Sequence, residues 1–131
     1  DSLEYLSRLH TPEVFRFCAI PQVMAIATLE ACFNNPQVFT GVVKIRKGLT
    51  ARLLVDSASL DGVHFWFCEL ARSVVSRCPE SDPSRAKILS AAKAIIALTE
   101  ARANAVSRTA LGRKVGVTVA LAAAVGAMNL S

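Results

Sequence analysis

The chain has 131 residues, of which 53% are apolar and 19% charged, and this composition excludes a disordered chain, because such chains are poor in apolar side chains. Its 15 Lys+Arg against 10 Asp+Glu give a net charge of +5, a modest excess that fits anionic partners and a plain basic surface equally well. The length suits about one small domain. Since the first residue is Asp1, we expect a piece of a longer chain.

Two helices are predicted at the start of the chain. Three leucines recur at a spacing of three and indicate one face of a short helix that ends near His10. Thr11 as N-cap and Pro12 at the first helical position predict that the next helix begins directly after it. Residues 14–29 are apolar nearly all round, so we expect this helix to be buried on all sides.

Pro21 lies in the middle of that apolar helix. Because proline cannot donate a backbone hydrogen bond and its ring clashes one turn back, the sequence predicts a break or kink near Ala19–Ile20. Arg16 and Gln22 are the strongly polar side chains of residues 14–27. Each needs a partner, either in the protein or in a ligand.

Further helices are predicted after turns that contain proline or a capping residue. Pro36 opens a short helix that ends at Gly41, and a helix over 49–55 follows the densest basic cluster of the chain, residues 44–48. Asp61 is the expected cap of a helix that carries Phe65-Trp66-Phe67 as a packed face. Asp82 and Pro83 then start another helix.

The end of the chain changes character. Three cations precede residues 115–130, a run without a charged residue, which as a helix spans about 24 Å against a hydrocarbon core of about 30 Å. We expect a C-terminal membrane anchor here, with a buried helix or disorder as alternatives. We therefore divide the chain into two regions: residues 1–104 as part of a helical domain, and residues 105–131 as a basic flank and anchor. The three cations are Arg108, Arg113 and Lys114.

Motifs that carry chemistry are missing from this sequence. It has no P-loop, no G-x-S-x-G and no G-x-G-x-x-G, and Asp56 and Asp61 are five apart, off one helical face. His10 and His64 are isolated. The four cysteines show no C-x-x-C pair and no zinc-ligand spacing, so we expect small buried side chains in a reducing compartment.

Residues 15–29 resemble the F-C-A-I-P-Q-V-M-A-I-A-T-L block of the squalene synthase family (farnesyl-diphosphate farnesyltransferases). Residues 5–9 are similar to its Y-L-S-R-L lead-in, and residues 34–48 to its N-N-x-Q-V-F and G-V-V-K-x-R-x-G segment, in wording closer to plant or algal members. The close similarity covers residues 1–52, and residues 53–100 are similar only loosely. Glu30 departs from the pattern, since an uncharged residue is usual there, and we expect it to mark an exposed helix end.

The resemblance implies an all-α fold, part of an isoprenoid-synthase-type helical bundle with a C-terminal hydrophobic tail helix. It also implies two reactions: two farnesyl diphosphates condense to presqualene diphosphate, which then rearranges and is reduced by NADPH to squalene. Mg²⁺ is expected on two aspartate-rich motifs that lie upstream in the family. This chain contains neither motif, so we expect a C-terminal portion that is inactive alone and contributes no metal ligand.

Site residues are carried over from matching family positions. Phe17, Cys18, Pro21 and Gln22 are expected to line the substrate cavity, with Phe17 offering its ring face to a carbocation. The alternatives are core packing for Phe17 and a structural hydrogen bond for Gln22.

Lys44 and Arg46 are expected to hold a diphosphate or, as we favour, the phosphates of NADPH. The alternative is a solvated basic loop. In the tail, Arg113 and Lys114 are placed to touch anionic lipid head groups.

We expect a monomer anchored in the endoplasmic reticulum membrane, with its catalytic part facing the cytosol. Two alternatives stay open: a related head-to-head prenyl synthase of squalene-synthase-like or phytoene-synthase-like type, and a non-catalytic, membrane-tethered helical fragment. Nucleic acid is not an expected partner, because the cations are few and the aromatic residues lie in apolar runs.

Overall fold

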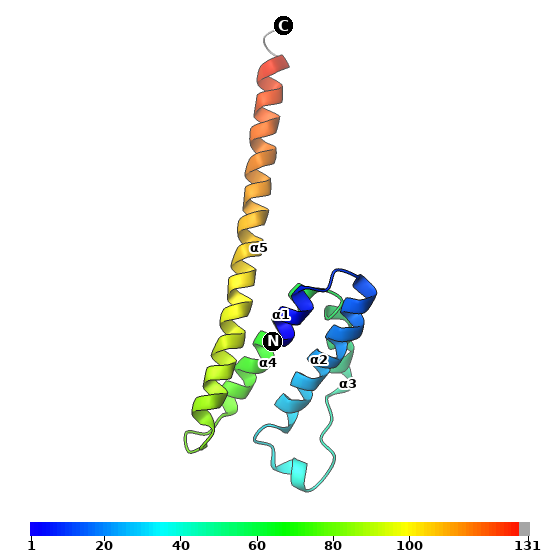
Figure 1. Cartoon of the computed structure of the whole chain (residues 1–131), viewed down its shortest axis with the longest axis vertical. Coiled ribbons are helices and arrows are strands. Elements are labelled where there is room, and N and C mark those ends of the chain that lie inside the picture. Colours follow the sequence, from blue (N-terminus) through cyan, green and yellow to red (C-terminus); the bar gives the residue numbers. More distant parts are fainter. Residues whose placement is uncertain (129–131) are drawn as a thin grey trace. The chain divides into compact units, whose positions relative to one another are not determined.

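The computed structural model describes the backbone of residues 1–128 and the side chains of residues 1–108. Every regular element of this part is a helix, which confirms the predicted all-α class (Figure 1). In chain order the elements are α1 (Ser2–Ser7), α2 (Pro12–Cys32), the 3-10 helix η1 (Pro36–Phe39), α3 (Lys47–Asp56), α4 (Leu60–Arg77) and α5 (Arg85–Met128).

The chain divides into two compact units, Asp1–Thr99 and Glu100–Ser131. The first unit holds α1 to α4 and the start of α5, and the second holds the remainder of α5, helical as far as Met128. The predicted membrane anchor at 115–130 lies outside the described side chains. The anchor and the predicted boundary after residue 104 therefore stay predictions.

The core of the first unit lies where α2 packs on α4, with α1 and α3 against both. Helix α2 contributes small and branched side chains spaced four apart, one helical face. Helix α4 contributes the two rings of Trp66 and Phe67, so the predicted packed aromatic face is confirmed, although Phe65 is half exposed. The buried cluster is Leu3, Leu6, Phe15, Ala19, Val23, Ala27, Leu53, Val63, Trp66, Phe67 and Leu70.

Helix α2 is buried on one side only, so the expectation of burial all round was wrong. Phe17 is 80% exposed and Leu29 69%. The reason is that α1, α3 and α4 all pack against α2, and the face with Ala19, Val23 and Ala27 is the one they cover. The described residues thus leave a second, apolar face of α2 open.

Pro21 does not break α2, which runs as one helix from Pro12 to Cys32. The expected break near Ala19–Ile20 is therefore not found. Proline removes the bond that its N–H would make to the Phe17 carbonyl, but its ring lies on the exposed side. The helix loses one bond there, and the bonds on either side maintain it.

Two helix starts differ from their predictions in detail. Ser59, not Asp61, is the N-cap of α4, and its side chain accepts a hydrogen bond from the Gly62 N–H at 3.1 Å. Asp61 lies in the first turn, where a negative charge still favours the helix. The short helix after Asn35 is a 3-10 helix, and the predicted restart after Pro83 is the beginning of α5.

Among the described residues, α2 is also the helix that is long and apolar enough to cross a membrane, with 21 residues and a mean hydropathy of 1.4. Core helices satisfy the same criteria. Because the Val23 side of α2 is fully buried against its neighbours, we describe α2 as the core helix of this unit.

Candidate functional site

Four predicted site residues lie together on α2. The spacing of Phe17, Cys18, Pro21 and Gln22 places them on one side of the helix. Phe17 and Pro21 are exposed, and Cys18 and Gln22 are half buried. The structure therefore brings these residues together on the open face of α2, with the Phe17 ring pointing away from the core cluster of the described residues.

Gln22 is half buried, and its side-chain amide makes no hydrogen bond within the described part of the chain. The alternative role for Gln22, a structural bond to a broken helix, finds no support, because α2 is continuous. A half-buried amide with spare donors and an acceptor can bind a polar group of a ligand. Gln22 is thus the polar group among three apolar neighbours.

Tyr5 joins this face and was missed by the sequence reasoning. Its hydroxyl lies 3.7 Å from the Cys18 sulfur, and this contact raises the pKa of the Tyr5 phenol above its usual 10.0, through the hydrogen bond first and the charge interaction second. Tyr5 is 52% exposed. The signal that could have found it is its position off the leucine face of α1.

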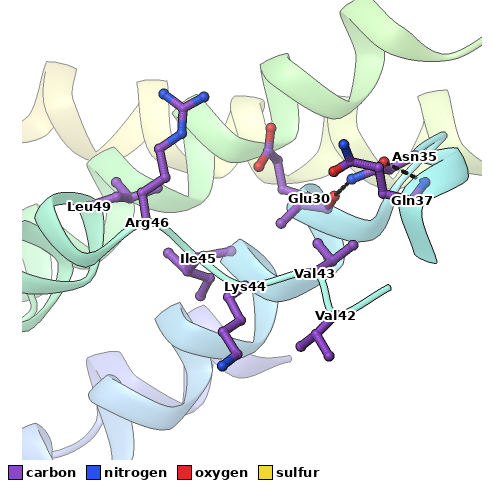
Figure 2. Close-up of a pocket in the computed structure, with 11 residues that line it drawn as sticks. Glu30, Asn35, Gln37, Val42, Val43, Lys44, Ile45, Arg46 and Leu49 are labelled. Carbon is purple, nitrogen blue, oxygen red and sulfur yellow. Dashed lines mark hydrogen bonds between the residues drawn. The ribbon is translucent and has the colours of Figure 1, made fainter. Parts of the chain in front are cut away.

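A second site is a cavity of about 580 Å³ between the end of α2, the segment 42–46 and the start of α3 (Figure 2). Lys44 and Arg46 both line it, but Figure 2 shows their side chains pointing to opposite sides of the segment. The structure thus brings both predicted cations to one cavity without placing them side by side. Its lining residues are Ala27, Glu30, Ala31, Asn35, Gln37, Val42, Val43, Lys44, Ile45, Arg46 and Leu49.

Glu30 also lines this cavity, and the expectation that it marks an exposed helix end was wrong. Its side chain is 20% exposed, and its Oε1 lies 2.6 Å from an Arg77 guanidinium nitrogen. The Ser73 hydroxyl donates to the same oxygen at 2.7 Å. The partners lie 43 and 47 residues along the chain, so local sequence gave no signal for them.

The described residues contain neither a candidate metal site nor a disulfide. No group of three or more His, Cys, Asp or Glu side chains is placed to hold a metal ion there. The four cysteines, all among the residues with described side chains, form no disulfide, and Cys68 and Cys78 are buried. The carboxylate of Asp56 accepts a hydrogen bond from the Trp66 indole at 2.9 Å, so the role of Asp56 is structural.

Known squalene synthases resemble this chain, although no family model matches it. Squalene synthase of Mus musculus is 54% identical over 87 residues, which are 66% of this chain and 21% of that protein. The Homo sapiens protein is 52% identical over 87 residues. Squalene synthase 8 of Panax ginseng is 47% identical over 95 residues, 72% of this chain and 24% of that protein. The plant-type prediction stays a prediction.

A solved structure of TcSQS in complex with the ligand BPH1237 matches 76% of this chain and 29% of its own, with a TM-score of 0.71 and 36% sequence identity. The chain spans less than a quarter of the length of the mouse and ginseng relatives. Sequence and fold agree on the same group of proteins. Over the matched residues, the chain therefore belongs to the squalene synthase family of head-to-head isoprenoid synthases.

Proposed function

We propose that this chain forms part of a squalene synthase that condenses two farnesyl diphosphates to presqualene diphosphate and reduces this intermediate to squalene with NADPH. The observation that carries the proposal is the open apolar face of α2, on which Phe17, Cys18 and Pro21 lie on the same side as the Gln22 amide. Such a face, long and almost without polar groups, suits the wall of an isoprenoid cavity.

The chemistry of the proposed reaction explains these residue types. Loss of diphosphate from an allylic or cyclopropylcarbinyl carbon leaves a carbocation, which water would capture as an alcohol unless the wall excludes it. The Phe17 ring, 80% exposed, can offer its face to that positive charge. Gln22 can orient a polar group of the substrate, such as a diphosphate oxygen.

The cofactor proposal rests on the second cavity. NADPH supplies hydride for the reductive step, and Lys44 and Arg46 line a space of about 580 Å³ in which they would hold its phosphates. The described residues do not fit Mg²⁺, because no three ligating side chains converge there. We therefore propose that the ligands of Mg²⁺ lie in a part of the enzyme that this chain does not include.

The remaining partners follow from the same proposal. Farnesyl diphosphate and presqualene diphosphate are the substrates, and the apolar tail is the proposed tether to the endoplasmic reticulum membrane, with the α2 face on the cytosolic side. We propose that the enzyme works as a monomer.

The test is an assay of the full-length protein with farnesyl diphosphate, Mg²⁺ and NADPH. The proposal expects squalene in the presence of NADPH and loss of squalene without it. An unreduced C30 product under all conditions would indicate the phytoene-synthase-like alternative instead. Absence of diphosphate release would overturn the enzymatic function and favour the non-catalytic fragment.

A further inference from the structure

The open face of α2 and the cavity between α2 and α3 meet on the same helix. Thr28 follows Pro21 by seven residues, or about two turns, so both lie on the same side of α2. Thr28 also precedes Ala31 by three residues, which makes these two neighbours on the helix surface, and Ala31 lines the cavity. Thr28 therefore lies where the open apolar face reaches the cavity.

Thr28 is exposed, and its hydroxyl directs its proton back to the helix. The hydroxyl donates a hydrogen bond to the Met24 carbonyl at 2.8 Å. A hydroxyl that donates in this way keeps two lone pairs as acceptors, and the donated bond polarises its oxygen, which strengthens the bond that it accepts. Thr28 thus offers a hydrogen-bond acceptor at the edge of the open face.

Ala25 provides space between Thr28 and the residues that are proposed to contact the substrate. It lies three residues before Thr28 and four after Pro21, so it is next to both on the helix surface. Ala25 is exposed, and Gln22, three residues before it, is half buried. Because the Ala25 side chain is a single methyl group, a flat ring could rest on it between Thr28 and Pro21.

We propose that Thr28 orients the nicotinamide of NADPH: its hydroxyl oxygen accepts a hydrogen bond from the carboxamide N–H, and Ala25 supports the ring. The inference rests on the proposed function, which supplies the cofactor, and it deepens that function by naming a residue for the reactive end of the cofactor. Reacting atoms must come within about 3–3.5 Å of each other, and phosphate contacts of Lys44 and Arg46 leave the ring free to turn. The bond to Thr28 fixes one edge of the ring at the border of the open face.

The experiment measures how much the nicotinamide contributes to binding by the full-length protein. Calorimetric titration compares NADPH with adenosine 2′,5′-bisphosphate, which carries a phosphorylated ribose but no nicotinamide. The key variants are Thr28→Val, which keeps the shape and removes the hydroxyl, and Thr28→Ser, which keeps the hydroxyl. The matched control is Thr99→Val, because the Thr99 hydroxyl donates to the Ile95 carbonyl on α5 at the same 2.8 Å. Thermal unfolding of each variant verifies the fold.

We expect Thr28→Val to weaken the binding of NADPH about three- to tenfold, which corresponds to one hydrogen bond between uncharged groups, and to leave the binding of the bisphosphate unchanged. Thr28→Ser and Thr99→Val should bind both probes as the wild type does. Equal changes for both probes in Thr28→Val, or no change for either, would overturn the inference. It would also be overturned if the wild type bound NADPH no more tightly than the bisphosphate.

A second measurement separates the two steps of the proposed reaction. Presqualene diphosphate formed without NADPH reports the condensation, which Thr28→Val should leave unchanged, whereas squalene formed with NADPH should decrease. A loss of both would contradict a role confined to the nicotinamide. Wild-type protein that binds neither probe and forms no squalene would overturn the proposed function. Wild-type protein that forms squalene, together with a Thr28→Val variant that binds NADPH normally, would overturn this inference alone.

Discussion

Arg77 and Glu30 join the ends of α4 and α2 through an ion pair of 2.6 Å, although 47 residues separate them. The same guanidinium also donates to the backbone carbonyl of Glu30, which accepts a bond from the Phe33 N–H as well. The Asn34 amide in turn donates to the Arg77 carbonyl at 3.1 Å. Glu30 thereby links the end of α4 to the lining of the cavity between α2 and α3.

We predict a coupling free energy of about 1–2 kcal/mol between Glu30 and Arg77 in a double-mutant cycle to alanine, measured by urea unfolding. The value is below that of a fully buried pair because the Arg77 side chain is 37% exposed and partly screened by solvent. The matched control is Arg8–Glu4, also at 2.6 Å but 74% and 62% exposed, for which we expect about 0.3–0.5 kcal/mol. Equal coupling in the two cycles would contradict the prediction.

Substitution by alanine should change the free energy of unfolding in opposite directions at the glycines of α3 and α4. A Cβ on Gly62 would lie 1.9 Å from the Asp56 carbonyl oxygen, so the backbone must move, whereas a Cβ on Gly48 meets nothing within 4 Å. We expect Gly62→Ala to destabilise by about 1–3 kcal/mol. We expect Gly48→Ala to stabilise by about 0.4–1 kcal/mol through the lower entropy of the unfolded chain. Chemical denaturation measures both, and a stable Gly62→Ala protein would refute the close approach.

Tyr5 is the single tyrosine of the chain, so the ultraviolet absorbance of phenolate reports its ionisation directly. Its pKa is raised above 10.0, mainly by the hydrogen bond with Cys18. A raised pKa means that this contact stabilises the fold below pH 10 and that the contribution is lost as the pH rises through the folded-state value. We expect Cys18→Ala to lower the Tyr5 pKa, and an unchanged titration would refute the contact.

Leu53 on α3 and Leu29 on α2 differ strongly in burial. Leu53 is 1% exposed and Leu29 69%. We expect Leu53→Ala to cost about 2–5 kcal/mol, because it removes buried methyl groups and leaves a cavity. We expect Leu29→Ala to stay within about 0.5 kcal/mol. Comparable losses for both, measured by thermal or chemical unfolding, would show that the α2 face is covered in the protein under test.

Under the proposed function, Phe17→Ala should lower the activity of the enzyme and leave its fold intact. This side chain is 80% exposed, so if it only packed against this unit, its removal would cause little loss of activity. If it forms part of the cavity wall, we expect squalene formation to fall about 10–100-fold, with more alcohol product. Phe17→Leu keeps the apolar wall and loses the ring face, so its rate should lie between. Full activity of both variants in the full-length enzyme would show that Phe17 is not part of the cavity wall.

Local sequence patterns predicted most of the helices correctly. The leucine spacing gave α1, and Thr11 followed by Pro12 gave the start of α2, since such signals act within one turn. The same reasoning placed the α4 cap on Asp61, because both Ser59 and Asp61 are good capping residues. Which one is used depends on the backbone between α3 and α4, and the sequence does not carry that geometry.

By itself, the sequence determined the all-α class, the helix starts and the position of Phe17, Cys18, Pro21 and Gln22 on one side of α2, because helical periodicity fixes which residues share a face. Only the tertiary structure decided which face of α2 is buried, that Glu30 meets Arg77, and that Glu30 lines the same cavity as Arg46. These relationships join segments tens of residues apart, and they depend on how α2, α3 and α4 pack, which no local pattern encodes.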